Sequence, residues 1–125
     1  MKEGHAQGVM AAYHDIDGIP CVANEWLLSK ILREEWGFDG IVVSDLGAIR
    51  RQVNDHHTAV DTEDAVVKSL KAGLNMQFYD FPYDDFQKAV VEAVKNGTLD
   101  EAVLDSRVAD VLRLKFRLGL FENPY

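Results

Sequence analysis

The feature that most constrains the fold of this chain is an alternation of short apolar runs with longer helical stripes. The clearest run, Ile-Val-Val-Ser at residues 41–44, follows a glycine and ends on Asp45. Near-continuous runs of this kind are typical of parallel strands that are covered on both faces. Strands that alternate with helices predict parallel pairing through helical crossovers. The sequence therefore predicts an α/β fold.

Three strand-and-helix pairs and one extra helix are predicted along the chain. The strands are expected at residues 9–13, 41–44 and 74–78, and the helices at 25–35, 63–72, 83–96 and 100–118. Asn24 is the expected N-cap of the first helix, and Asp61 or Thr62 that of the second. Residues 14–20 are predicted to form a loop, and residues 45–60 a long connection without clear periodicity.

The number of predicted strands bears on whether the sheet can close. A (β/α)8 barrel uses eight strands and about 250 residues, whereas this chain of 125 residues has material for about three units. It is therefore either a small open sheet or a piece of something larger. The abrupt start and the Asn-Pro-Tyr ending favour a piece.

Composition excludes several classes of function. The net charge of -8 argues against nucleic-acid and anionic-membrane partners, which both require basic patches. No segment has the apolar length that spans a membrane, and the amino terminus lacks the hydrophobic centre of a signal peptide. The localisation stays open. The single Cys21 is predicted to be a small packed side chain.

The carboxylate of Asp45 follows the clearest strand directly. In α/β sheets, ligands bind outside the carboxyl ends of the strands, so an acid at this place points to chemistry. A helix N-cap is the alternative role of an aspartate after a strand. From these residues alone, both interpretations stay open.

Spaced motifs along the chain carry a family resemblance. They are Val-Met-Ala-Ala-Tyr at 9–13, Asp-Gly-Ile-Pro at 17–20, Leu-Arg-Glu-Glu-Trp-Gly-Phe-Asp-Gly at 32–40, Val-Val-Ser-Asp at 42–45, Ala-Gly-Leu-Asn-Met at 72–76, and residues 112–125. In this order they resemble the C-terminal part of the catalytic barrel domain of glycoside hydrolase family 3. The resemblance implies a partial (β/α)8 TIM barrel over residues 1–120, with residues 121–125 beginning a linker to a second domain.

The same resemblance implies an activity and its residues. The family's retaining β-glycosidases hydrolyse terminal non-reducing β-D-glucosyl or β-D-xylosyl residues of small β-glycosides or oligosaccharides. Asp45 matches the catalytic nucleophile, and Tyr13 and Met10 match positions that line the sugar pocket. The family site uses no metal and no cofactor.

Two positions depart from the family pattern. Leu46 matches a further substrate-binding position, where many relatives carry a Trp that stacks on the aglycone; an aliphatic side chain lacks that stacking face, so a preference for the leaving group cannot be carried over. Relatives often have Asp where this chain has Asn75, which is expected to make local hydrogen bonds. The acid/base glutamate of the family lies outside the matched region. The isolated chain is therefore expected to be inactive.

The alternative from another class is a non-catalytic sugar-binding or assembly module that self-associates through exposed strand edges. The remaining polar clusters have ordinary structural interpretations. His56 and His57 fit no established zinc spacing and are predicted to pack or hydrogen-bond in a loop. Solvated positions are predicted for a further set of acidic residues: Asp80, Asp84, Asp85, Glu92 and Glu122.

Overall fold

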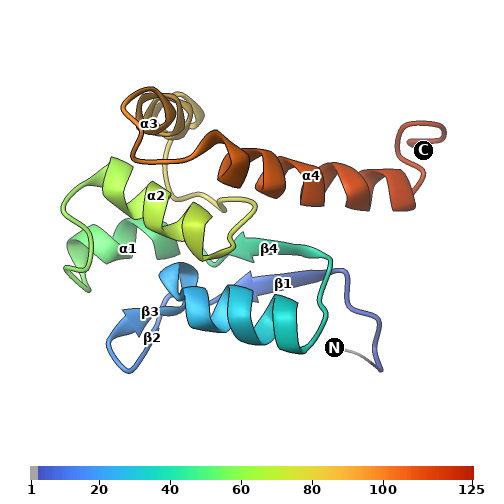
Figure 1. Cartoon of the computed structure of the whole chain (residues 1–125), viewed down its shortest axis with the longest axis horizontal. Coiled ribbons are helices and arrows are strands. Elements are labelled where there is room, and N and C mark those ends of the chain that lie inside the picture. Colours follow the sequence, from blue (N-terminus) through green and yellow to red (C-terminus); the bar gives the residue numbers. More distant parts are fainter. Residues whose placement is uncertain (1–2) are drawn as a thin grey trace.

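The computed structural model describes residues 3–125, and its elements follow the predicted order (Figure 1). A short parallel sheet lies among helices, as the alternation of strands and helices indicates. The elements are β1 (Gly8–Ala11), β2 (Asp15–Ile16), β3 (Ile19–Pro20), η1 (Cys21–Ala23), η2 (Trp26–Glu35), β4 (Ile41–Ser44), α1 (Ala48–Asn54), α2 (Thr62–Ala72), α3 (Tyr83–Lys95) and α4 (Glu101–Arg117).

Strands β1 and β4 pair in parallel, with Met10 opposite Val43 and Ala11 opposite Ser44. Figure 1 shows the two strands side by side and pointing the same way. Val42 and Ser44 are buried, whereas Met10 is 56% exposed. Because side chains alternate along a strand, one face of the sheet packs into the core and the other, carrying Met10 and Val43, lies open.

Helix α2 is the centre of the helical packing. It contacts α1, α3 and η1, and six of its residues are buried. Val66 and Leu70 of this helix belong to the same core as Val42 of the sheet and Leu28 of η2. Gly73 ends the helix with a φ of 126°, close against Leu28, so only a glycine fits there without strain.

The predicted helix caps are confirmed in the structure. Leu27 N donates to Asn24 Oδ1 at 3.0 Å, and Asp64 N donates to Asp61 Oδ1 at 2.9 Å. Asp61, and not Thr62, is therefore the cap of α2. The first helix differs in its winding, because η2 is a π-helix. Its Leu28 and Leu32 are buried as expected.

The predicted strand at residues 74–78 is wrong in extent, since only Met76 forms a bridge, parallel to Val43. Side chains take over the neighbouring hydrogen bonds. Phe78 N donates to the hydroxyl of Ser44, and the amide of Gln77 exchanges two hydrogen bonds with the backbone of Phe81. The chain therefore turns away before a regular ladder can form.

Four elements of the structure were not predicted: β2, β3, η1 and α1. The short strands β2 and β3 pair antiparallel within the expected loop at 14–20. Helix α1 lies within the connection at 45–60. Its buried face contains a polar residue, Gln52, whose side-chain nitrogen donates to Ser69 Oγ at 2.8 Å and to the Ala65 carbonyl at 3.3 Å. A polar residue at a buried position hides the apolar stripe from which a helix is predicted.

Candidate active site at the carboxyl end of the sheet

Asp45 leaves the carboxyl end of β4 beside β1. Its N–H donates to the Ala11 carbonyl at 2.8 Å, which extends the strand pairing by one residue. Its own carbonyl accepts from Ala48 N at 3.0 Å, and its Oδ1 accepts from Leu46 N at 2.6 Å. Helix α1 has Gly47 at its N-cap, so the Asp45 carboxylate is not the cap of this helix.

The alternation of side chains along β4 places the Asp45 side chain on the open face, because Val42 and Ser44 point into the core. Met10 lies on that face too, opposite Val43 in the register. Asp45 itself is partly exposed, and within residues 3–125 its Oδ2 has no hydrogen-bond donor. One carboxylate oxygen is therefore free to meet a ligand.

Tyr13 follows the carboxyl end of β1 and is held by groups from α1 and the loop after it. The guanidinium carbon of Arg51 lies 4.6 Å from the centre of the Tyr13 ring, a cation–π contact. The Nε2 of His56 lies 2.8 Å from the Tyr13 carbonyl oxygen. Leu46, next to Asp45, is 53% exposed. The structure thus brings Asp45, Tyr13, Met10 and Leu46 to the same edge or face of the sheet.

Asp80 contradicts its predicted solvated position, because only 4% of its surface is exposed. Ser44 Oγ donates to Asp80 Oδ2 at 2.6 Å, and Ile49 N donates to Asp80 Oδ1 at 2.6 Å. Arg50 N adds a hydrogen bond at 3.2 Å. Burial raises the pKa of the Asp80 carboxyl above its ordinary value, although these hydrogen bonds favour the charged form.

Sequence reasoning missed Asp80 although a signal was present. Like Asp45, this acid follows shortly after an apolar run that was predicted to be a strand. The other acidic residues are placed as predicted: Asp84 and Asp85 lie in the first turn of α3, and Glu92 and Glu122 are exposed.

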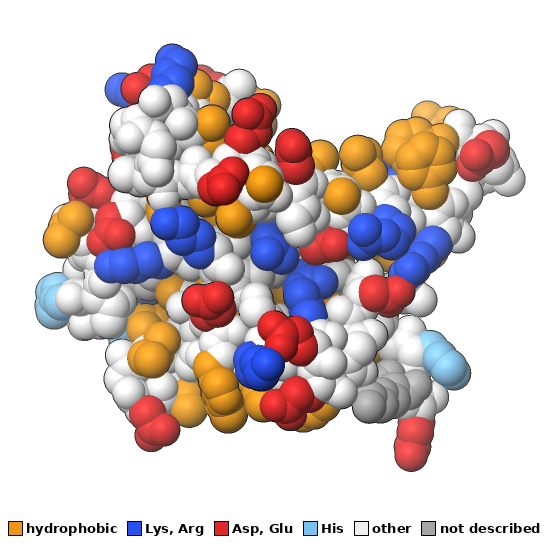
Figure 2. Space-filling model, viewed as in Figure 1, with side chains coloured by type: hydrophobic (Ala, Val, Ile, Leu, Met, Phe, Trp, Pro, Cys, Tyr) orange, Lys and Arg blue, Asp and Glu red, His pale blue; other side chains and the backbone are white. Residues whose placement is uncertain are grey.

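Asn75 has the local hydrogen-bonding role that was predicted for it. Its Oδ1 accepts from Val42 N and from Arg33 Nη2, both at 2.8 Å, and its Nδ2 donates to Asp110 Oδ2 at 3.0 Å and to the Arg107 carbonyl at 3.1 Å. Figure 2 shows acidic and basic side chains gathered between α4 and η2, where this cluster lies. The carboxylate beside Arg33 thus comes from Asp110 on α4.

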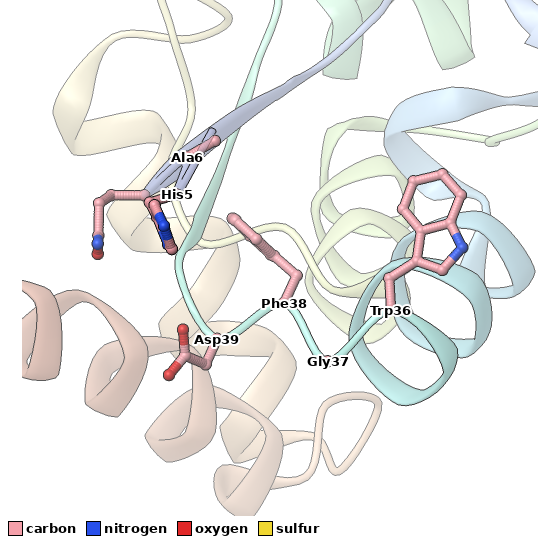
Figure 3. A pocket seen from close by; sticks show the side chains of 7 residues that line it. His5, Ala6, Trp36, Gly37, Phe38 and Asp39 are labelled. Carbon is pink, nitrogen blue, oxygen red and sulfur yellow. The ribbon is translucent and has the colours of Figure 1, made fainter. Parts of the chain in front are cut away.

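A small pocket of about 190 Å³ lies at the other end of the strands. Its lining comes from the segments that precede β1 and β4, and in Figure 3 Phe38 points toward the strands while Trp36 lies apart at the helix end. Because ligands bind at the carboxyl ends of parallel strands, this pocket is separate from the candidate site.

The two adjacent histidines make local hydrogen bonds. His56 bonds to Tyr13 as described, and His57 Nδ1 lies 3.0 Å from the Val53 carbonyl oxygen. Along residues 3–125, no group of three His, Cys, Asp or Glu side chains converges on a metal position.

Cys21 is buried, and burial raises the pKa of its thiol. No helix in the same range is long and apolar enough to cross a membrane.

A parallel sheet among helices, with a partly exposed carboxylate at the carboxyl end of one strand, defines an α/β protein with an acid-bearing candidate site. Residues 2–114 match the model of the glycosyl hydrolase family 3 N-terminal domain. The chain belongs to this family.

Similar proteins include glycosidases from several organisms. A periplasmic β-glucosidase of Salmonella typhimurium is 43% identical over 117 residues, covering 94% of this chain and 15% of that protein. A putative β-xylosidase of Formosa agariphila is 39% identical over 125 residues, covering 100% of this chain and 16% of that protein. The crystal structure of a β-glucosidase from Listeria innocua in complex with glucose superimposes with a TM-score of 0.91 at 36% identity, over 99% of this chain and 17% of that one.

The shares of chain length covered also set the extent of the likeness. The chain spans about 15% of the length of the curated relatives that it matches. The likeness is to the family's N-terminal domain, and it covers only a part of each glycosidase.

Proposed function

We propose that this chain forms the C-terminal part of the (β/α)8 catalytic barrel of a retaining β-glycosidase, with Asp45 as nucleophile. The observation that carries the proposal is the setting of Asp45. Its backbone is tied to β1 and to α1, while one oxygen of its carboxylate is free. A nucleophilic carboxylate must be ionised, fixed and accessible, and the end of a packed strand meets these needs.

The proposed chemistry divides between this chain and the rest of the barrel. Asp45 attacks the anomeric carbon and forms a covalent glycosyl-enzyme, while the leaving group departs with a proton from a second carboxylic acid about 5–5.5 Å away. That acid is proposed to lie outside the chain. Asp80 is unsuited to the role, because its oxygens already accept hydrogen bonds from Ser44, Ile49 and Arg50 in a buried position.

The other site residues are proposed to bind the sugar. Tyr13 offers a half-exposed ring and a hydroxyl, which suits contact with carbohydrate C–H groups and with a carboxylate. Met10 offers a thioether on the same open face as Asp45. Leu46 gives an aliphatic surface beside the nucleophile, in place of a stacking ring. The proposed substrate carries a terminal β-D-glucosyl or β-D-xylosyl residue, and the relatives named β-glucosidase and β-xylosidase support this class.

The free edges of the sheet support the view that the barrel is completed by further units. An apolar groove of about 240 Å³ lies between β1 and η2, and another of about 590 Å³ lies between the Met76 segment and helices α3 and α4. In a (β/α)8 barrel, neighbouring strand-and-helix units cover both places. The same edges favour the second candidate, a non-catalytic module that self-associates through them.

A hybrid protein tests the proposal. The chain replaces the matching segment of the Listeria innocua β-glucosidase, and hydrolysis of an aryl β-D-glucoside is measured. The hybrid is expected to turn over, and Asp45→Asn is expected to lower kcat by ~10³-fold or more, because the covalent route is lost. Asp39→Asn, an exposed carboxylate before β4, is the matched control. A folded hybrid without activity, or an active Asp45→Asn variant, contradicts the proposal.

The isolated chain separates the two candidates. It is expected to show no turnover of the same glucoside, with or without association. Size-exclusion chromatography reports its oligomeric state. A stable oligomer of the chain, together with a folded but inactive hybrid, supports the assembly module.

A further inference from the structure

A buried carboxylate braces the turn that carries Asp45 from both sides. On one side, Asp80 Oδ2 accepts the hydroxyl of Ser44, the last residue of β4. On the other side, Asp80 Oδ1 accepts the amides of Ile49 and Arg50 at the start of α1. Asp45 and the three residues after it lie between these anchors. The conformation of that turn therefore depends on a side chain from the segment that precedes α3.

The hydroxyl of Ser44 extends the brace to the neighbouring segment. It donates to Asp80 at 2.6 Å and accepts from Phe78 N at 2.7 Å. Gly47 N, inside the turn, donates to the Phe78 carbonyl oxygen at 3.5 Å. The carboxyl end of β4, the turn and the segment after Met76 are thus joined into one hydrogen-bonded unit around Asp80.

The choice of a buried acid here is costly if it serves only as a helix cap. The partners of Asp80 are neutral: a hydroxyl and two backbone amides. Burying a carboxylate without a cation is unfavourable, whereas Ser, Thr or Asn caps a helix without that cost. Two acceptor oxygens pointing in different directions are needed to hold Ser44 and α1 together, and a carboxylate supplies them.

We infer that Asp80 is a positioning residue for the nucleophile: it fixes the turn from Ser44 to Ile49 so that the Asp45 carboxylate is held in its attacking orientation by the Leu46 amide. This inference rests on the proposed role of Asp45. Asp80 itself does not touch the substrate. It acts through the backbone at the two ends of the turn.

Nuclear magnetic resonance of the 125-residue chain gives a local readout that does not need activity. The Leu46 amide donates to Asp45 Oδ1 at 2.6 Å, a short charge-assisted hydrogen bond that shifts its proton resonance downfield. In Asp80→Asn this resonance is expected to move upfield, and its hydrogen exchange to become about tenfold faster. The matched control is Asp110→Asn, another buried carboxylate, on α4.

Ser44→Ala keeps the inference testable if Asp80→Asn does not fold, because it removes one anchor and leaves the cap of α1. The same change of the Leu46 amide is expected, in reduced size. The inference is overturned if the Leu46 amide resonance and its hydrogen exchange are unchanged in a folded variant. Altered Ile49 and Arg50 amide resonances in Asp80→Asn would then show that Asp80 is only a helix cap.

The hybrid with the Listeria innocua enzyme supplies the catalytic readout. Asp80→Asn is expected to lower kcat by ~10–100-fold with KM within about twofold, because misplacement of a reacting group slows chemistry more than binding. An active hybrid whose kcat is unaffected by Asp80→Asn overturns the inference and leaves the proposed function intact. A folded, inactive hybrid rejects the proposed function, while the Leu46 signal still reports whether Asp80 orders the turn.

Discussion

Asp110 is the carboxylate whose removal tests the packing of α4 against the sheet most directly. It is 8% exposed overall. Its Oδ2 lies 3.3 Å from Arg33 Nη2 and 3.7 Å from Arg107 Nη1, and its Oδ1 accepts from Arg113 Nη1 at 2.9 Å. Asp110→Asn keeps the shape of the side chain and removes its charge. Two nearly buried guanidinium groups then lose their carboxylate.

The expected loss of unfolding free energy is about 3 kcal/mol. Removing one partner of a buried ion pair typically costs ~3–5 kcal/mol, because the remaining charge stays buried without compensation. The lower end applies here, since Arg33 keeps hydrogen bonds to the Gly40 and Gly73 carbonyls. Arg113 is 45% exposed, so its pair with Asp110 adds only ~0.5 kcal/mol.

A second substitution tests whether charge is the cause. Asn75 Oδ1 already lies 2.8 Å from Arg33 Nη2, the nitrogen that also faces Asp110, so Asn75→Asp places a second carboxylate against the same guanidinium nitrogen. The single change is expected to cost about 2 kcal/mol, because the donor to Asp110 and to the Arg107 carbonyl is lost. In the double variant with Asp110→Asn, the total loss of unfolding free energy is expected to be smaller, by at least about 1.5 kcal/mol, than the sum of the two single losses.

Urea unfolding of the chain, followed by circular dichroism, measures these differences as shifts of the midpoint at constant slope. Asp39→Asn is the control, since its ion pair with Arg117 is exposed to solvent and its loss should leave the midpoint nearly unchanged. A loss below about 1 kcal/mol for Asp110→Asn, or strict additivity in the double variant, refutes the reasoning.

Three further predictions concern the strands and their ends. Because the folded-state pKa of Asp80 is raised by burial, its contribution to stability is full below about pH 4 and is lost as pH rises through that raised pKa. The unfolding free energy of wild type minus that of Asp80→Asn, measured by urea titration, should therefore fall from acid toward neutral pH; a flat difference contradicts this. Gly40→Ala should lower the unfolding free energy by ~3 kcal/mol, because a Cβ there would lie 2.2 Å from the Gln7 carbonyl oxygen. Gly8→Ala is the control: no atom lies closer than 3.8 Å to its added Cβ, so thermal unfolding should show a change of less than about 1 kcal/mol. Leu46→Trp should leave stability within ~0.5 kcal/mol because the side chain is exposed, and in the hybrid it should lower KM for an aryl glucoside by providing a stacking surface; an unchanged KM rejects the aglycone role.

Local signals were enough to predict the elements whose ends are marked by caps and glycines. The stripe of α2, its Asp61 cap and the glycine after it lie within a single stretch of chain, so they can be read without knowing the tertiary contacts. The position of Asp45 at the carboxyl end of a strand was predicted for a similar reason, because the acid directly follows an apolar run. Its role as nucleophile came from the family resemblance and stays a proposal.

The two failed predictions, at Gln52 and Asp80, have the same cause: tertiary contacts with residues distant in the sequence. Gln52 faces the core because Ser69 and Ala65 of α2 accept its hydrogen bonds, and those partners are not visible near it in the sequence. Asp80 is buried because its partners, Ser44 and the start of α1, precede it by about thirty residues. In both cases a polar residue was predicted from its own chemistry, and its position depends on distant partners.

The same principle explains how so short a strand as β4 can hold Asp45 in place. The segment beyond α2 meets β4 through one bridge, at Met76, and the missing ladder bonds are replaced by side chains at both ends. Val42 N donates to Asn75 Oδ1, and Phe78 N donates to Ser44 Oγ. Each of these polar side chains is in turn bonded to a buried carboxylate, Asn75 to Asp110 and Ser44 to Asp80. The two acids therefore stabilise opposite ends of β4 in the same way, each by hydrogen-bonding the side chain that holds that end. Loss of Asp110 should loosen the amino end and α4, while loss of Asp80 should loosen the end that carries the nucleophile.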